Sequence, residues 1–300
     1  MNTEFDTRPA LPRRRFIRLA GGGAVLVVLP LASCSSANPP AAVRAWQAPD
    51  DTTDLRRWML AYALLAPNPH NRQSWIADLK RDTEITLVCD ADRLLPETDP
   101  FGRQVLIGCG AFIEPAAIAA AERGHRVSVD LFPEGVPNRR ELPGGSAVAR
   151  LRVALDAALR RDPLFAQIRR RHTRKGAYDS ARAVPSALWR GLEASATERG
   201  LMACSIDEPE PMATLRLITR DSLETEMLTP RTYLESARLK RIGPAEIEQH
   251  RDGISLMGTG VRLTAGVGAF DRFEVPRRDS SNYRPTMARW SLFESGSGYF

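Results

Sequence analysis

Two short polar stretches of this 300-residue sequence hold side chains whose types and spacing could do chemistry. The first, PNPHNRQSW at residues 67–75, places two asparagines among rigid prolines just before an expected strand. Such a loop can cap two helices, or it can present its amide groups to a planar polar ligand. The second, RHTRK at residues 171–175, offers donors to an anionic ligand. Bases at a helix C-terminus are, by themselves, also typical of a solvated helix end.

The histidines and the common catalytic motifs point to no other site. The four histidines include no HxxxH pair, and the sequence contains neither GxSxG nor GxGxxG. His70 is predicted to form local hydrogen bonds rather than to act as a catalytic acid. Glu246, Glu248 and His250 fall within one expected helix and are predicted to lie on the surface.

The cysteines also lack the spacing of a metal or disulfide site. Besides Cys34, the chain has Cys89, Cys109 and Cys204, an odd number with no CxxC pair. Neither a zinc site nor a disulfide framework is therefore expected. These three cysteines are predicted to be small buried hydrophobes.

The first polar stretch is expected between a helix and a strand. Apolar residues from Leu55 to Ala66 recur at helical spacing, and the prolines of residues 67–69 end that helix. Strands are expected at residues 75–79 and 85–89. A long helix follows at residues 101–123, in which Gly108-Cys109-Gly110-Ala111 has so little side-chain bulk that another helix or a ligand can approach closely, and close packing of a helix is the preferred interpretation.

The rest of the chain indicates an α+β fold in two halves of similar layout, divided near residue 155. Alternating apolar residues predict strands at 127–131 and 151–155. Asp162-Pro163 predicts the start of a helix that ends in the basic stretch. Further expected elements are helices at 186–199, 212–228 and 245–250 and strands at 201–206 and 290–293. The apolar pair Tyr299-Phe300 reads as a half-made strand, so we interpret the chain as shortened at its C-terminus.

The two polar stretches resemble signatures of the FMN-dependent nitroreductase family. The first resembles the pattern P-S-x-x-N-x-Q-P-W, and the second resembles R-[HR]-[ST]-x-[RK]. The similarity extends to TPRTY at residues 229–233 and to DPFGR at residues 99–103, and it is greatest to the exported two-domain, Acg-type branch. This resemblance implies a nitroreductase-like fold, in which a mixed sheet is flanked by helices and the two halves form a fused pseudo-dimer.

The resemblance also implies one composite FMN site made from both halves. The first half, residues 51–155, keeps the asparagine motif. The second half, residues 156–300 and incomplete at its C-terminus, keeps the basic motif, and TERGL at residues 197–201 stands where its own asparagine motif would be. The implied cofactor-binding residues are Pro67, Asn68, Pro69, Asn71, Gln73, Arg171, His172, Thr173 and Lys175.

These residue types match the polar atoms of FMN. Arg171 can hold the phosphate with a bidentate fork, while His172 and Thr173 add donors to phosphate or ribityl oxygens. The resemblance places Lys175 near flavin N1 and the C2 carbonyl, where a cation stabilises the reduced cofactor. Asn68 and Pro69 depart from the small hydroxyl residues of the family, and Ser74 departs from its proline. No protein side chain is assigned a catalytic role of its own, since the flavin carries the chemistry.

The N-terminus resembles an export signal. Arg13-Arg14 lies in a twin-arginine pattern, the apolar run at residues 20–31 is too short to span a bilayer, and LASC ends in Cys34 as a lipobox does. We therefore expect a signal peptide at residues 1–34, a flexible linker at 35–50, the twin-arginine translocase as a partner, and a periplasmic protein or a lipoprotein anchored to the membrane through Cys34.

The charge of the expected mature chain does not indicate a nucleic-acid partner. Residues 1–33 hold five arginines against Glu4 and Asp6, so removing them leaves 37 positive and 34 negative residues, a net charge of +3. No long Lys/Arg run remains. The partners expected instead are small-molecule electron donors and acceptors.

Three functions remain open at the level of the sequence. The first is an exported FMN-dependent oxidoreductase that reduces nitroaromatic or quinone-like acceptors by two electrons. NAD(P)H is scarce outside the cytoplasm, so the second is an FMN-binding or sequestering protein without turnover. The third is a structural lipoprotein without a cofactor. A yellow purified protein would separate the third from the other two.

Overall fold

A computed structural model describes residues 38–47, 53–138, 141, 143–174 and 176–300. The export residues Arg13 and Arg14, the lipobox cysteine Cys34 and the expected flavin ligand Lys175 lie outside the described residues.

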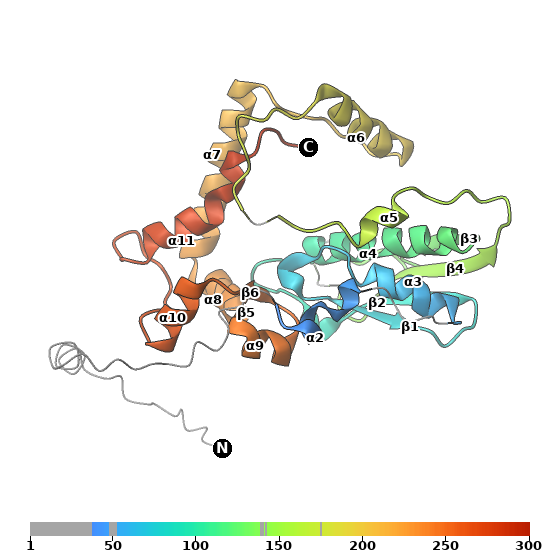
Figure 1. The fold of residues 1–300 in the computed structure, drawn as a ribbon, viewed down its shortest axis with the longest axis horizontal. Helices are drawn as coiled ribbons and strands as arrows, with labels where there is room; N and C mark the ends of the chain where they lie inside the picture. The colour runs from blue at the N-terminus through green and yellow to red at the C-terminus, as the bar shows by residue number, and fades with distance from the viewer. Residues whose placement is uncertain (1–37, 48–52, 139–140, 142, 175) are drawn as a thin grey trace, which may run out of the picture. The chain divides into compact units, whose positions relative to one another are not determined.

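An antiparallel four-stranded sheet forms the centre of the first half (Figure 1). Its strands follow the order β1-β2-β4-β3, so that β2 and β4 are central. The bounds are Trp75–Asp78 for β1, Glu84–Cys89 for β2, His125–Leu131 for β3 and Ala147–Leu155 for β4. In the register, Trp75 pairs with Cys89, Ile85 with Leu151, and Val129 with Leu151.

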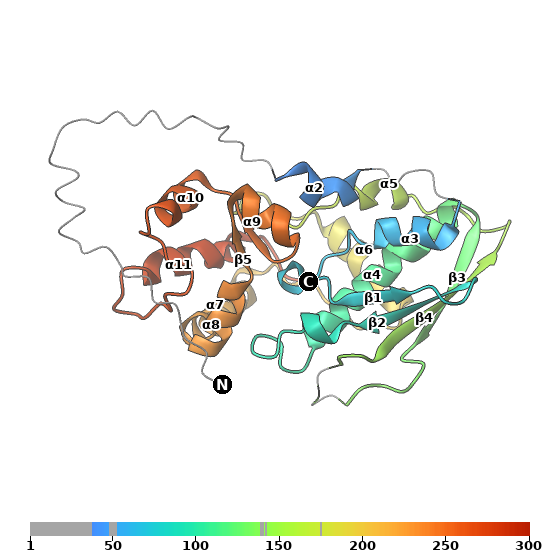
Figure 2. The ribbon, with the colours of Figure 1, turned by 90° about the horizontal axis from the view of Figure 1, so that it is seen from below.

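Helix α4 (Arg103–Glu122) packs on this sheet, and α3 (Leu55–Ala63) packs on α4 (Figure 2). The core between them contains Met59, Leu87 and Phe112, all fully or almost fully buried. Among the described residues, α4 is the helix long and apolar enough to cross a membrane by length and composition. Because much of its surface is buried in this core, the apolar composition of α4 is explained by its packing as a core helix.

The remainder of the chain is mainly helical. Two short elements precede α3, namely α2 (Pro40–Val43) and the 3-10 helix η1 (Arg44–Trp46). Parallel strands β5 (Lys240–Ile242) and β6 (Ile254–Leu256) form a second, small sheet. The other elements are η2 (Pro69–Asn71), η3 (Ala91–Arg93), α5 (Phe165–Ile168), α6 (Ser186–Glu198), α7 (Pro209–Leu228), α8 (Pro230–Arg238), α9 (Gly243–His250), α10 (Thr259–Gly266), α11 (Tyr283–Trp290) and η4 (Ser291–Ser295).

The α+β class is confirmed, whereas two expected strands and one expected helix length are wrong. Residues 201–206 form no strand, and only Ile206 makes an isolated bridge, to Tyr299. Residues 290–293 end α11 and begin η4 instead of forming a strand. Helix α5 has only 4 residues, because the basic stretch leaves the helix rather than extending it.

Two further sequence expectations differ from the structure. Residues 40–46 of the expected flexible linker are helical, because Trp46 packs beside the apolar cluster of Tyr62 and Ile168. Cys204 is exposed rather than buried, since its segment forms no strand, while Cys89 and Cys109 are buried as expected. The four-stranded sheet is not repeated in the described part of residues 156–300, and the pseudo-dimer remains a prediction.

Candidate functional site

The loop between α3 and β1 holds the first polar stretch in an unusual backbone conformation. His70, Asn71 and Gln73 all have φ near +50°. Left-handed residues other than glycine cost about 1–2 kcal/mol each, and they persist only where surrounding contacts hold them. Strain of this kind tends to concentrate at functional sites, so the contacts of this loop are informative.

Asn68 holds the loop together from inside. Its side-chain oxygen accepts a hydrogen bond from the Gln73 backbone nitrogen at 2.8 Å, and its Nδ2 donates to the Ala66 carbonyl at 3.2 Å. This side chain therefore spans the left-handed segment. Because both ends of the Asn68 amide have partners in the chain, Asn68 acts as an internal cap of the loop.

The loop also rests on a helix that permits a close approach. A Cβ built on Gly108 of α4 would lie 3.2 Å from the Asn68 Cβ and 3.3 Å from the Pro69 Cδ. The close approach expected at this glycine is therefore real, although the partner is the loop rather than another helix. Pro69 packs against α4.

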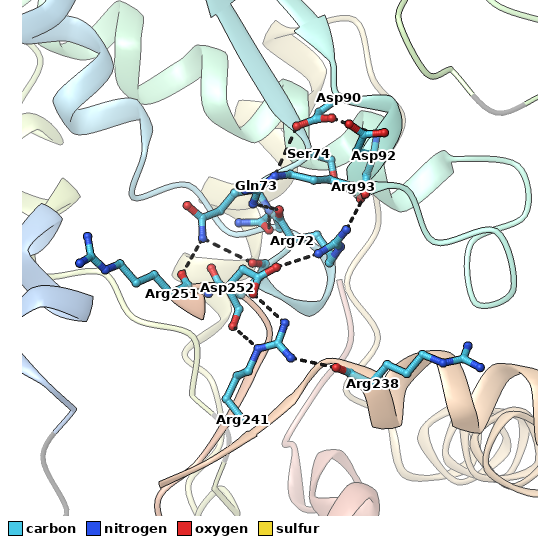
Figure 3. Close-up of polar contacts among 12 residues, drawn as sticks. Arg72, Gln73, Ser74, Asp90, Asp92, Arg93, Arg238, Arg241, Arg251 and Asp252 are labelled. Atoms are coloured by element: carbon cyan, nitrogen blue, oxygen red, sulfur yellow. Dashed lines mark hydrogen bonds and ion pairs between the residues drawn. The ribbon is translucent and has the colours of Figure 1, made fainter. Parts of the chain in front are cut away.

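A buried ion cluster joins the loop to the second half (Figure 3). The Arg72 guanidinium donates to the Asp252 carboxylate at 2.7 Å, and Arg241 donates to the other oxygen of the same carboxylate at 2.8 Å. The three side chains are 11–14% exposed. A carboxylate between two guanidinium groups at this depth ties the α3–β1 loop to the segment between α9 and β6.

Backbone and amide contacts strengthen this junction. Gln73 Nε2 donates to the Arg251 carbonyl at 3.0 Å, and the Gly253 amide donates to the Asn71 carbonyl at 3.3 Å. A Cβ on Gly253, where φ is +83°, would lie 2.2 Å from the Leu239 carbonyl oxygen, so glycine is required there. The side chain of Gln73 is thus used to join the halves.

Helix α8 supplies a second set of contacts to the first half. His70 Nε2 lies 2.8 Å from the Ser236 hydroxyl, so His70 makes a long-range contact to α8. The Glu235 carboxylate accepts from the amides of Glu97 at 3.1 Å and Thr98 at 2.8 Å. Glu248 and His250 are exposed as expected, and Glu246 is partly exposed and pairs with Arg272 at 2.6 Å.

The second polar stretch is brought to the loop by α5. Phe165 of α5 contacts Tyr62 of α3, with ring centroids 4.8 Å apart, and Ile168 is buried in the same cluster. Arg171 leaves this helix and donates from Nη2 to the Leu65 carbonyl at 2.6 Å. Burial lowers the pKa of Arg171 from its usual value, although an arginine stays protonated at neutral pH.

Trp46 of η1, which precedes α3 in the sequence, packs against the same basic stretch. Its ring centroid lies 5.0 Å from that of His172, and the Arg171 guanidinium carbon lies 5.9 Å from it. An aromatic residue in the expected linker thus becomes part of the site. Its sequence signal was the presence of one tryptophan in an otherwise polar and alanine-rich segment.

One cavity of about 610 Å³ is lined by residues of both polar stretches. Its volume is within the roughly 300–1,000 Å³ range of cofactor and small-molecule sites. The lining residues are Asn38, Val43, Trp46, Leu64, Leu65, Ala66, Pro67, Asn68, His70, Asn71, Arg171, His172, Thr173, Gly253 and Ser255.

Most of the predicted binding residues meet in this cavity. Pro67, Asn68, Asn71, Arg171, His172 and Thr173 line it. Gln73 lines a neighbouring cavity with Asn71 and Trp46, and Pro69 is absent from both linings. Residues without a predicted role, among them Trp46, Gly253 and Ser255, complete the wall because distant segments meet there.

The donors in the cavity suit a ligand with an anionic group and polar ring atoms. In the part of the chain that the structure describes, the side chains of Asn71, Thr173 and Ser255 have no hydrogen-bond partner, and Arg171 uses only one nitrogen. Leu64, Leu65 and Trp46 provide an apolar wall. Over the same described residues, no cluster of His, Cys, Asp or Glu could hold a metal ion.

Comparison with known proteins finds relatives over part of the chain. No family model matches. The chain is 38% identical over 82 residues to "Putative NAD(P)H nitroreductase acg" of Mycobacterium tuberculosis, which is 27% of this chain and 24% of that protein. It is 33% identical over 78 residues to "Putative NAD(P)H nitroreductase Rv3131" of the same organism, 26% of this chain and 22% of that protein. The match thus spans about a quarter of these relatives, and it supports a relationship to the nitroreductase family.

Proposed function

We propose that this protein is an FMN-dependent oxidoreductase of the nitroreductase type, which passes two electrons to nitroaromatic or quinone-like acceptors. The cavity that brings Asn71 together with Arg171 and Thr173 carries this proposal. The relationship to NAD(P)H nitroreductases gives the reaction class, and the donor set of the cavity fits FMN. The flavin, when bound, supplies the electron transfer.

The residues of the chain bind and orient the cofactor in this proposal. Arg171 is held by the Leu65 carbonyl, so its remaining nitrogens are preset to bind a phosphate with little loss of side-chain entropy. Thr173 adds a hydroxyl donor beside it. Asn71, fixed by the strained loop, offers its amide to the ring or ribityl atoms, and Lys175 is proposed to place its charge near the flavin ring.

Flavin retention tests this proposal directly. The full chain is expressed, loaded with FMN and passed through a desalting column, and the retained cofactor is measured by its visible absorbance. Arg171→Ala is expected to lower the affinity for FMN about 10-fold or more, because a charge-assisted hydrogen bond contributes roughly 1.5–3 kcal/mol. Arg170→Ala is the matched control, since Arg170 is the exposed neighbouring residue. Unchanged FMN content in Arg171→Ala and in Lys175→Ala would show that the site assignment is wrong.

Reduction of the bound flavin separates turnover from binding alone. Loss of visible absorbance with NADPH or a quinol, followed by its return on adding a nitroaromatic or quinone, supports an oxidoreductase. A flavin that stays oxidised with both donors supports the alternative, an FMN-binding or sequestering protein. The predicted export signal favours considering this alternative, because NAD(P)H is scarce outside the cytoplasm.

A further inference from the structure

A second cavity of about 470 Å³ is lined in part by Arg174, near the end of the basic stretch. Its walls come from the segment after residue 173, from β6, from the end of α11 and from η4. The lining residues are Arg174, Gly176, Tyr178, Ile254, Ser255, Arg289, Trp290, Leu292 and Phe293.

The chemistry of this lining is aromatic and cationic. Tyr178, Trp290 and Phe293 supply rings that can stack on a planar ligand. Arg174 and Arg289 supply guanidinium groups, and no acidic residue is among the lining residues that the structure describes. Arginine binds carboxylates in a planar, bidentate manner and also stacks on aromatic faces.

Arg289 is the cation whose charge is most available to a ligand. Its side chain is exposed and has no hydrogen bond or ion pair among the described residues. Arg174, by contrast, donates from Nη2 to the Ala177 carbonyl at 3.0 Å, which anchors one edge of its guanidinium at the cavity. The two positive groups come from segments more than a hundred residues apart in the sequence, and the fold places them around one space.

The second cavity borders the candidate flavin cavity. Ser255 of β6 lines both, and the residues that precede Arg174 line the first cavity while Arg174 and Gly176 line the second. The two cavities therefore have Ser255 in common.

We propose that this cavity binds a planar aromatic anion, an aromatic carboxylate being the simplest member, with Arg289 and Arg174 on its charge and Trp290 and Phe293 on its ring. A role of this ligand as the electron acceptor rests on the proposed function above. The binding itself does not, because it requires only the residues of the second cavity.

Isothermal titration of the full chain with an isosteric pair of probes tests the proposal. We expect 4-nitrobenzoate to bind about 10-fold more tightly than 4-nitrobenzamide, which corresponds to roughly 1.4 kcal/mol, and this preference to weaken as salt is added. Equal affinity for the two probes would overturn the proposal.

Variants of α11 locate the charge recognition. Arg289→Ala and Arg289→Gln are expected to remove the preference for the carboxylate, whereas Arg284→Ala, an exposed arginine of the same helix outside the cavity lining, is expected to keep it. Retention of the preference in both Arg289 variants would overturn the assignment. Two Arg289 variants are used so that a folding defect in one, detected by its circular dichroism spectrum, does not decide the result.

The titration also distinguishes failure of the cofactor proposal from failure of this one. If the chain holds no flavin but retains the Arg289-dependent preference, the anion site stands and the oxidoreductase proposal fails. If the chain holds flavin and shows no preference, the anion site fails while the cofactor site stands.

Discussion

The asparagines of the α3–β1 loop have different surroundings although they are three positions apart. The amide of Asn68 is satisfied within the loop by Gln73 and Ala66. The side chain of Asn71 lines the candidate flavin cavity and has no hydrogen-bond partner in the described chain. At the scale of residues, the first is therefore expected to affect stability and the second to affect ligand binding.

Paired substitutions test this division. Asn68→Ala removes the loop's internal cap and is expected to lower the free energy of unfolding by about 1–2 kcal/mol. Asn71→Gly removes the amide but keeps the left-handed backbone accessible, so it should leave the unfolding free energy within about 0.5 kcal/mol of wild type and weaken FMN binding. Urea unfolding and FMN titration measure the two effects. The same loss of stability in both variants would contradict the assignment.

Lys240 is a buried cation that should make stability depend on pH. It is 6% exposed, and its ammonium nitrogen lies 4.3 Å from the centroid of the Tyr233 ring. Burial, together with the positive charges of Arg289 and Arg272, lowers the pKa of Lys240 to about 8 from its usual 10.5. The folded state therefore releases this proton at a lower pH than the unfolded state does.

The sign of the effect follows from proton binding. Below pH 8 both states hold the proton, and the penalty for burying the charge is fully present. Between pH 8 and 10.5 the unfolded state binds more protons, so stability rises with pH. Relative to Lys240→Met, wild type should gain roughly 2–3 kcal/mol between pH 7 and pH 10. Urea unfolding of both proteins at each pH measures this gain. If the difference between their unfolding free energies stays constant from pH 7 to pH 10, this account is wrong.

At the scale of elements, the α3–β1 loop depends on the segment between α9 and β6. The Arg72–Asp252–Arg241 cluster connects them at low exposure, and the strained backbone of His70, Asn71 and Gln73 lies directly beside it. Two elements from different halves thus determine the conformation of one wall of the cavity.

Replacing the shared carboxylate by a neutral amide should weaken the contact between these two elements. Asp252→Asn leaves Arg72 and Arg241 buried without a counter-charge, and it is expected to lower the free energy of unfolding by about 3 kcal/mol and to weaken FMN binding as well. Asp279→Asn is the control, because the Arg277–Asp279 pair is 77% and 79% exposed and should contribute at most about 0.5 kcal/mol. Similar urea midpoints for the two variants would show that the cluster does not hold the loop.

At the scale of the whole molecule, the export prediction concerns residues outside the described chain. The N-terminus combines Arg13-Arg14, a short apolar run and Cys34. We propose that the twin-arginine translocase exports the folded protein and that Cys34 carries a lipid anchor, which gives a periplasmic or membrane-anchored location. This route transports folded cargo and is compatible with a cofactor inserted beforehand.

Conservative substitutions of the signal test the route. Replacing Arg13 and Arg14 together by lysine preserves the charge but should abolish transport, so the precursor is expected to accumulate in the cytoplasm of a bacterial host. Arg8→Lys, outside the motif, should have no effect on transport. Cell fractionation followed by immunoblotting measures the distribution. Normal export of the double variant would exclude the twin-arginine route.

The sequence alone determined the elements whose pattern is complete within a short window. The apolar spacing of α3 and the alternation in β3 and β4 were sufficient, because each signal depends on neighbours within a few turns or strand residues. The strands expected at 201–206 and 290–293 were wrong, because short apolar runs do not separate strand from helix or coil.

Only the tertiary structure decided which of the candidate residues share a site. Arg72 and Asp252 are 180 residues apart, and Arg171 reaches a carbonyl 106 residues away, so no local period could reveal either contact. The same packing gave the side chains of Asn68 and Gln73 partners within the chain, and it left the side chain of Asn71 without a partner among the described residues at the cavity. The residue types allowed a ligand site, whereas long-range ion pairs and burial selected the residues that line it.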